Sequence, residues 1–215
     1  MRLVVHGATG RIGGAILAEA LARGHVVTAV VRASSTAKLG DGKTDGVTTH
    51  RLDLLDQDQG PEIVRLTAEH DATISAIGWT QGQPQDVLVR VARALLPASG
   101  GRPLLVVGGS GTLMTASGKI YVETPGFPPE RRANSLAHVA ALDVYRAAHD
   151  VPWIYLCPPA VITQDTKTGK YRVGAADMVT DDEGRSAISV ADYATAAVDL
   201  LERPDAERGH LNVAY

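Results

Sequence analysis

A glycine-rich segment near the amino terminus has the spacing that binding a pyrophosphate requires. Gly7, Gly10 and Gly13 lie between an apolar stretch typical of a strand and an Ala/Leu-rich stretch typical of a helix. The first glycine allows a tight turn, the second lets backbone approach a phosphate, and the third lets the helix pack close to the strand. The N–H groups and dipole of the first helical turn then face the anion. The segment predicts a dinucleotide site; a plain strand–helix turn is the alternative. The residues expected to hold the pyrophosphate are Gly7, Thr9, Gly10, Arg11, Ile12 and Gly13.

The residue at the end of the second predicted strand indicates which dinucleotide is bound. Sites for NAD have a carboxylate there, which accepts hydrogen bonds from the ribose. This chain has Arg32, followed by hydroxyl side chains at positions 34–36. A guanidinium pairs with a 2′-phosphate through two hydrogen bonds, and Arg11 could contact the same phosphate from the other side. The sequence therefore favours NADP(H) over NAD(H); a solvated strand end is the alternative for Arg32.

Two further segments are expected around the adenosine. Asp53 and Leu54 follow the third predicted strand, where Asp53 could accept from the adenine amino group and Leu54 could pack on the ring. An aspartate that caps a loop turn is an equal alternative. The short segment of Ala76, Ile77 and Gly78 after the fourth strand would let the ribose lie close to the backbone. A simple turn is the alternative for Gly78.

Predicted strands and helices alternate along almost the whole chain. Near-continuous apolar strands separated by helices indicate a parallel sheet covered on both faces. Right-handed crossovers then give an α/β fold with a doubly wound, mostly parallel sheet, the Rossmann arrangement. We expect one domain over residues 1–215, with a small carboxyl-terminal portion that faces the substrate. The strands are predicted at residues 2–6, 25–31, 47–52, 71–77, 103–107, 153–157 and 210–214, and the helices at 10–23, 61–69, 84–96, 133–149 and 189–202.

Two local features refine this arrangement. Ser189 begins the last predicted helix and Asp192 follows three residues later, which predicts a capping box. The Gly/Pro-rich segment from 113 to 129 is the longest irregular piece. A loop of that length inside a compact domain is more often functional than idle.

Composition and charge exclude several other classes of protein. The chain has 215 residues, a formal net charge of −3 and one cysteine, Cys157. It has no dense Lys/Arg tract and no apolar run long enough to span a bilayer, so neither nucleic acid nor a membrane is an expected partner. One cysteine forms no internal disulfide, and no Cys/His cluster suggests a metal such as zinc. Because the first strand carries the proposed site rather than a cleaved signal, we expect a cytoplasmic protein.

The motifs together resemble the atypical short-chain dehydrogenase/reductase family, over essentially the whole chain. Within that family the chain is most similar to the NAD(P)H-binding, NmrA-like branch, which includes NADH-flavin reductase-like proteins and biliverdin reductase B. The resemblance implies an NAD(P)H-dependent oxidoreductase. The motifs that carry it are the glycine segment with Arg32, residues 107–113, Pro158-Pro159, residues 168–171, and the tail from Ser186 through Tyr193 to Leu201.

The catalytic pair of the ordinary family members is missing from this chain. Those members use Tyr-x-x-x-Lys, in which the tyrosine moves the hydroxyl proton and the lysine lowers the tyrosine pKa. Here Tyr145 is followed four positions later by His149, and Tyr193 by Ala197. Hydride transfer to a flavin, a quinone or a similar planar ring needs stacking and orientation more than a tuned tyrosine. We therefore expect a reductase of such a small-molecule acceptor, with a flavin as the favoured substrate.

The resemblance also implies residues at the reacting end of the site. Ser110 follows the fifth strand, where the family often keeps a substrate-facing serine or threonine, and a turn serine is the alternative. His138 lies near the place of a histidine that faces the substrate in biliverdin reductase B, and an ordinary surface or core histidine is the alternative. Pro158 begins a turn that borders the nicotinamide in relatives.

A different class of function fits the missing pair equally well. An NmrA-like sensor would bind the dinucleotide and signal to a protein partner without turnover. A substrate cleft lined by aromatic loops would favour the enzyme, whereas a cleft blocked by residues 113–129 would favour the sensor. The loop side chains that could stack on a planar ring are Trp79, Met114, Tyr121 and Phe127, with packing onto the domain as the alternative.

Overall fold

One eight-stranded sheet forms the centre of the molecule. The computed structural model describes residues 1–32, 46–203, 205–206 and 208–215. The strands of the sheet are β1 (Arg2–His6), β2 (Val26–Val31), β3 (Val47–Arg51), β4 (Ala72–Ser75), β5 (Leu104–Val107), β6 (Trp153–Cys157), β8 (Arg172–Gly174) and β10 (Gly209–Ala214). Their order is β3-β2-β1-β4-β5-β6-β10-β8, and every neighbouring pair is parallel except β10 and β8. This confirms the predicted α/β fold with a doubly wound, mostly parallel sheet.

The strand order reverses direction on either side of β1. His6 at the end of β1 pairs with Val30 of β2 on one side and with Ser75 of β4 on the other. After β1 the chain adds β2 and β3 on one side of β1, and it then crosses to the other side to add β4 and β5. In doubly wound sheets a ligand crevice forms at such a switch point, beside the carboxyl ends of the strands.

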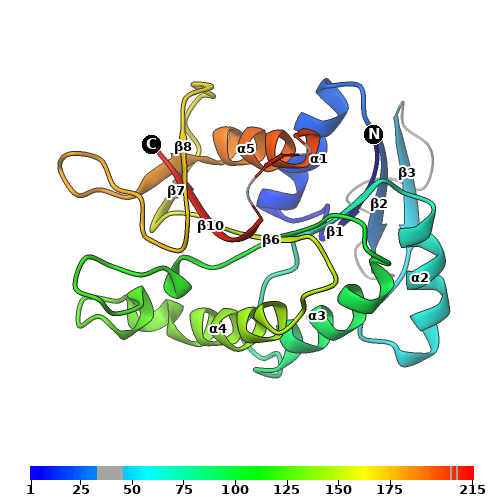
Figure 1. The fold of residues 1–215 in the computed structure, drawn as a ribbon, viewed down its shortest axis with the longest axis horizontal. Coiled ribbons are helices and arrows are strands. Elements are labelled where there is room, and N and C mark those ends of the chain that lie inside the picture. Colours follow the sequence, from blue (N-terminus) through cyan, green and yellow to red (C-terminus); the bar gives the residue numbers. More distant parts are fainter. Residues whose placement is uncertain (33–45, 204, 207) are drawn as a thin grey trace.

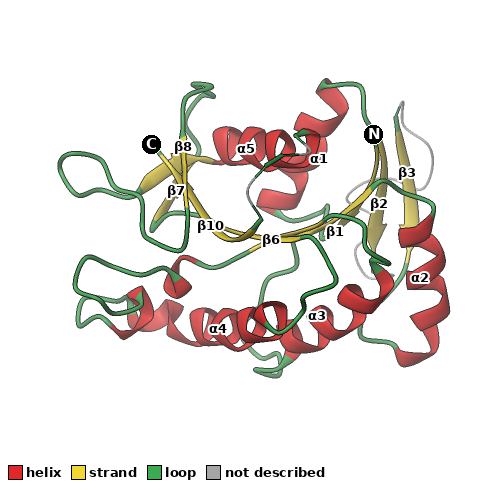
Figure 2. Cartoon of the chain, in the orientation of Figure 1, coloured by secondary structure: helices red, strands yellow, loops and turns green. Residues whose placement is uncertain are grey.

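Helices cover both faces of the sheet (Figures 1 and 2). The helices are α1 (Arg11–Ala22), α2 (Gly60–Ala68), α3 (Val87–Ala98), α4 (Arg132–Arg146) and α5 (Val190–Glu202). Helices α1 and α5 pack together on one face, while α3 packs against both α2 and α4 on the other. Figure 2 shows the sheet edge-on between these two layers.

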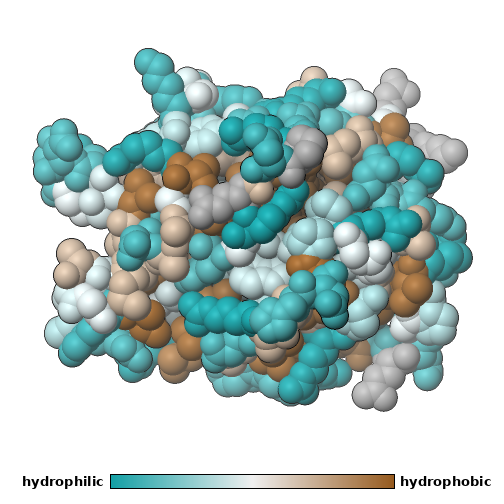
Figure 3. Space-filling model, in the orientation of Figure 1, coloured by the Kyte–Doolittle hydropathy of each residue, from teal (hydrophilic) through white to brown (hydrophobic). Residues whose placement is uncertain are grey.

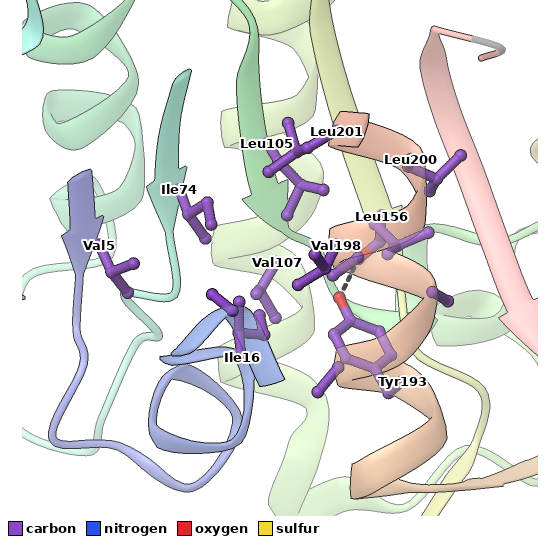
Figure 4. Packing of buried hydrophobic residues seen from close by; sticks show 14 of the residues in the cluster. Val5, Ile16, Ile74, Leu105, Val107, Leu156, Tyr193, Val198, Leu200 and Leu201 are labelled. Atoms are coloured by element: carbon purple, nitrogen blue, oxygen red, sulfur yellow. Dashed lines mark hydrogen bonds between the residues drawn. The ribbon is translucent and has the colours of Figure 1, made fainter. Parts of the chain in front are cut away.

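Alternate side chains of β1 supply the two cores between these layers. Leu3 and Val5 belong to the core under α1 and α5, and Val4 belongs to the core under α2, α3 and α4. This alternation follows from the two-residue period of a strand. In the first core the hydroxyl of Tyr193 on α5 donates to the carbonyl oxygen of Leu156 at 2.7 Å, which fastens α5 to β6 (Figure 4).

A buried carboxylate ties the carboxyl-terminal segments together. Both oxygens of Asp192, in the first turn of α5, accept hydrogen bonds from the backbone N–H of Thr168, and one also accepts from the N–H of Gly169 at 2.7 Å. The hydroxyl of Tyr215 donates to the same carboxylate at 2.7 Å. Burial by itself would raise the pKa of Asp192, but the donors outweigh it and lower the pKa to about 2.

The capping box expected at the start of α5 forms in a modified way. The backbone N–H of Asp192 donates to the Ser189 hydroxyl at 3.0 Å, as a capping box requires. The reciprocal bond differs, because the backbone N–H of Ser189 donates to the Tyr215 hydroxyl instead of to the Asp192 side chain. Tyr215 is near Ser189 in space but distant from it in sequence, so the local sequence could not reveal this change of hydrogen-bond partner.

Most of the other predicted elements are present with shifted ends, and three short strands were not predicted. Helix α3 begins at Val87 rather than at residue 84, and α4 ends at Arg146 rather than at residue 149. The unpredicted strands are β8 and the parallel pair β7 (Val161–Thr163) and β9 (Ala187–Ser189). Within the described residues, every helix is too short or too polar to cross a bilayer. The face in Figure 3 is mostly hydrophilic, with hydrophobic patches among the hydrophilic residues.

Candidate active site

The glycine segment forms a tight loop between β1 and α1. Gly7 has φ +78°, and a Cβ added there would lie 2.6 Å from the backbone oxygen of Ala76. The N–H of Gly10 donates to the carbonyl oxygen of Gly7 at 3.0 Å and closes the loop. A Cβ on Gly13 would lie 2.2 Å from that same oxygen, so α1 approaches the loop as closely as backbone allows. The loop therefore has the form of a cradle for an anionic group at the amino terminus of α1.

A first cavity of about 260 Å³ opens beside this loop, at the ends of β1, β2, β3 and β4. Arg32, Asp53 and Leu54 all line it. The other predicted cofactor residues that line it are Gly7, Thr9, Gly10, Ala76, Ile77 and Gly78. The structure thus brings the residues predicted to surround the adenosine to one cavity. The hydroxyl residues at positions 34–36 lie outside the described residues.

Asp53 also serves the turn that the alternative interpretation expected. Its Oδ1 accepts from the backbone N–H of Leu55 at 3.0 Å, and its own N–H donates to Oε1 of Gln59 at 2.9 Å. The carboxylate is thereby fixed in place while it lines the cavity. Leu54 next to it is buried and provides an apolar wall.

A second cavity of about 560 Å³ lies on the other side of the loop. It shares Gly10, Ala76, Ile77 and Gly78 with the first cavity, so the two meet above the end of β4. The other predicted site residues that line it are Arg11, Ile12, Ser110, His138 and Pro158. Of the predicted site residues only Gly13 lines neither cavity, because it packs beneath the loop.

His138 is held firmly in the wall of the second cavity. Its Nδ1 lies 2.7 Å from the hydroxyl oxygen of Tyr155 on β6, and that hydroxyl donates to the carbonyl oxygen of His138 at 3.2 Å. The ring also packs on Gly109, where an added Cβ would come within 2.7 Å of two ring atoms. Burial lowers the pKa of His138 to about 4, so the imidazole is neutral at physiological pH.

Two neighbours of His138 were missed by the sequence analysis. Asn134 and Ser135 on α4 line the same cavity as His138. They precede it by four and three positions, which is the spacing of one helix face. Helical spacing from His138 could therefore have identified them.

The long segment 113–129 does not fill the second cavity. Within the described residues no member of this segment lines it, whereas Trp79 does. Tyr121 and Phe127 instead pack edge-to-face, with ring centroids 4.9 Å apart. Met114 forms backbone bridges with Ile120 and Asp177. Of the four loop side chains considered for stacking, only Trp79 is placed to contact a ligand there.

The buried tyrosines are committed to the core. Burial raises the pKa of Tyr145, Tyr155 and Tyr193 above the ordinary value of 10.0. The hydroxyls of Tyr155 and Tyr193 are each bonded to a backbone carbonyl. None of these three can serve as the proton-transferring tyrosine of the ordinary family members.

His6 lies under the first cavity as an unpaired buried base. Only 1% of the residue is exposed, and neither ring nitrogen has a hydrogen-bond partner among the described residues. Burial, assisted by His50, lowers the pKa of His6 from 6.5 to about 3. Between these two values the unfolded chain binds a proton that the folded protein does not, so stability falls as the pH drops.

Replacing His6 by leucine should therefore weaken the acid sensitivity of the fold. Each pH unit below 6.5 removes about 1.4 kcal/mol of stability through this group. From pH 7 to pH 5 we expect His6→Leu to lose about 2 kcal/mol less than the wild-type protein. Urea unfolding at both pH values measures the difference, and parallel losses in the two proteins would contradict the assignment.

Comparisons with known proteins agree with this geometry. A family model described as NAD(P)H-binding matches residues 7–204. The uncharacterised protein YwnB of Bacillus subtilis (strain 168) is 34% identical over 215 residues, which cover 95% of this chain and 94% of that protein. A crystal structure from Burkholderia pseudomallei, described as a putative exported protein, matches with a TM-score of 0.86 and 36% identity over 100% of both chains. Another, from Streptococcus pneumoniae TIGR4, is described as a putative NADH-flavin reductase and matches with a TM-score of 0.86 and 29% identity over 100% of this chain and 99% of that one.

Proposed function

Since this chain belongs to the NAD(P)H-binding family, we propose that it is an NAD(P)H-dependent reductase that transfers a hydride to a flavin or a similar planar conjugated acceptor. The description of the S. pneumoniae relative as a putative NADH-flavin reductase supports this class of acceptor. The proposal includes a small-molecule acceptor as a partner, and neither nucleic acid nor a membrane. It also places the protein in the cytoplasm, where nicotinamide coenzymes are regenerated.

The observation that carries the proposal is the open second cavity beside the glycine loop. It shares Gly10 and the residues at the end of β4 with the first cavity, so a dinucleotide that spans the loop would reach it. Trp79 and Pro158 line this cavity and supply apolar surface for a planar ring. A sensor without turnover needs no such acceptor space, so the open cavity supports the enzyme.

The residues present fit the coenzyme and divide its binding between the two cavities. Backbone alone lies at the cradle around Gly7 and Gly13, because a side chain there would overlap backbone atoms. Asp53 and Leu54 frame the adenine in the first cavity. Ser110 and His138 line the second cavity, where they would contact the acceptor. When bound, NAD(P)H supplies a hydride from nicotinamide C4, the acceptor ring takes both electrons, and one proton from water completes its reduction.

We further propose that NADP(H) is the preferred coenzyme because Arg32 binds its 2′-phosphate. Arg32 follows the end of β2 and lines the first cavity. Replacing it by alanine removes a charge-assisted pair that NADH cannot form, so the Kd for NADPH should rise roughly 10–100-fold. The Kd for NADH should stay within about twofold, and calorimetric titration of both coenzymes checks this. Equal weakening of both coenzymes would remove Arg32 from the phosphate site.

The proposed activity is tested by oxidation of NADPH in the presence of FMN and riboflavin. We expect turnover with both flavins and none in their absence. Binding of NADPH without turnover on any flavin or quinone would contradict the enzyme and favour a sensor that signals to a protein partner.

A further inference from the structure

One tautomer of the His138 imidazole satisfies both of its contacts with Tyr155 as hydrogen bonds. The Tyr155 hydroxyl has one proton, and the carbonyl oxygen of His138 can only accept it, at 3.2 Å. The 2.7 Å contact between Nδ1 and the phenol oxygen is then a hydrogen bond only if Nδ1 is the donor. This is the one arrangement in which both contacts are hydrogen bonds. It leaves Nε2 with a free lone pair.

His138, which carries this free Nε2, lines the second cavity. Nε2 of His138 has no hydrogen-bond partner among the described residues, and 5% of the residue is exposed. The Tyr155 bonds hold one side of the ring and Gly109 packs on its face, so the ring has little freedom to turn. No carboxylate lines this cavity in the described part of the chain. His138 therefore offers a hydrogen-bond acceptor at a fixed position, in a cavity that has no negatively charged acceptor among the described residues.

We propose that His138 is a specificity-determining residue that accepts a hydrogen bond from a ring N–H of the acceptor. The inference rests on the proposed reductase function and names the ligand chemistry of the same site. The pyrimidine part of a flavin has such a group, N3–H, between two carbonyls. Quinones have carbonyl acceptors only and cannot satisfy Nε2. The site accordingly selects imide-containing rings over quinones.

Methylation of the flavin at N3 tests this selection. Lumiflavin and 3-methyllumiflavin are compared as acceptors at saturating NADPH, because they differ only in the donor. A bound ring covers Nε2 and removes it from water, and an acceptor left unpaired there costs enough that kcat/KM for the methylated ring should be roughly 10–100-fold lower in the wild-type protein. His138→Leu keeps similar bulk and has no acceptor, so the two flavins should react within about threefold of each other there.

Further variants distinguish hydrogen-bond acceptance by His138 from an effect of its side-chain size and from a folding defect. His138→Gln retains an acceptor oxygen and should keep a preference for lumiflavin. Tyr155→Phe frees the tautomer of His138 and should reduce the preference while the Kd for NADPH stays unchanged. His149→Leu, an exposed change just beyond α4, should behave as the wild-type protein. A ¹⁵N–¹H spectrum should show the His138 proton on Nδ1.

The outcomes distinguish the inference from the function on which it rests. Equal rates for the two flavins in the wild-type protein would overturn the inference and leave the reductase standing. A proton on Nε2 of His138 would also overturn it. Failure to reduce either flavin would overturn the proposed function and the inference together.

Discussion

Replacing Gly13 by alanine is expected to raise the Kd for NADPH at least about 100-fold, which corresponds to about 2.7 kcal/mol. The new Cβ would lie 2.2 Å from the carbonyl oxygen of Gly7 and 2.8 Å from its carbon, both of them backbone atoms that cannot rotate away. The clash is removed only if α1 moves away from the loop, and this movement displaces the N–H groups that form the cradle. Overpacking of this kind also costs about 1–3 kcal/mol of folding stability. Calorimetry measures the affinity, and circular dichroism at low temperature verifies that the variant is folded.

Gly14 provides the matched control for this change. A Cβ there would lie 3.3 Å from the carbonyl oxygen of Ala8, a tight contact that a small shift relieves. Gly14→Ala changes the same helical turn and improves its helix propensity by up to about 1 kcal/mol. It should keep the Kd for NADPH within about threefold. If Gly13→Ala binds the coenzyme as tightly as Gly14→Ala does, close packing of the loop on α1 is not what the site needs.

Asp192→Ala is expected to destabilise the fold by about 3–5 kcal/mol and to lower Tm by about 10 °C. The substitution removes one carboxylate and leaves the backbone N–H groups of Thr168 and Gly169 without their acceptor. The Tyr215 hydroxyl loses its acceptor as well. Loop 168–169, the start of α5 and the carboxyl terminus therefore loosen together. Urea unfolding at neutral pH measures the loss.

Asp143 provides a control for Asp192, because its replacement removes a carboxylate that is exposed to solvent. Asp143 on α4 pairs with Arg146 at 3.3 Å, and 67% of its side chain is exposed. Such pairs contribute little, so Asp143→Ala should leave Tm nearly unchanged. A loss in Asp192→Ala no larger than in Asp143→Ala would show that the buried hydrogen bonds carry no net stability.

The pH dependence of the Asp192 contribution has a definite sign. The folded-state pKa of about 2 lies below the ordinary value of 3.8. The stabilisation is therefore complete above pH 3.8 and is lost as the pH falls toward 2. Asp192→Ala should remove this part of the acid transition, whereas His6→Leu acts at higher pH.

The amino-terminal half of the site could be predicted because its signals are local. Strand β1, the glycine loop and α1 are consecutive in sequence, and Gly7 and Gly13 have roles set by backbone geometry alone. Arg32, Asp53 and Leu54 each follow a strand of one parallel sheet, so their convergence follows from the topology. The structure brings these residues together around one cavity; their contacts with a coenzyme stay a prediction.

The remaining features depend on contacts between distant segments. Strands β7, β8 and β9 have three residues each, too few for a period-two pattern to appear in the sequence. The bond between His138 and Tyr155 joins α4 to β6, and no spacing rule relates a helix residue to a strand residue. Asp192 was identified only as part of a local cap, because apart from the Ser189 hydroxyl its donors come from residues 168–169 and from Tyr215.

Anaerobic stopped-flow mixing of the protein and NADPH with FMN shows whether hydride reaches a flavin in the second cavity. If hydride passes from nicotinamide C4 to the flavin within the second cavity, the nicotinamide and flavin absorbances fall together. The transfer step is then slowed several-fold by deuterium at the transferred position. A protein that binds NADPH but leaves the flavin oxidised, or a reduction rate that is independent of the protein, would show that the protein is not a flavin reductase.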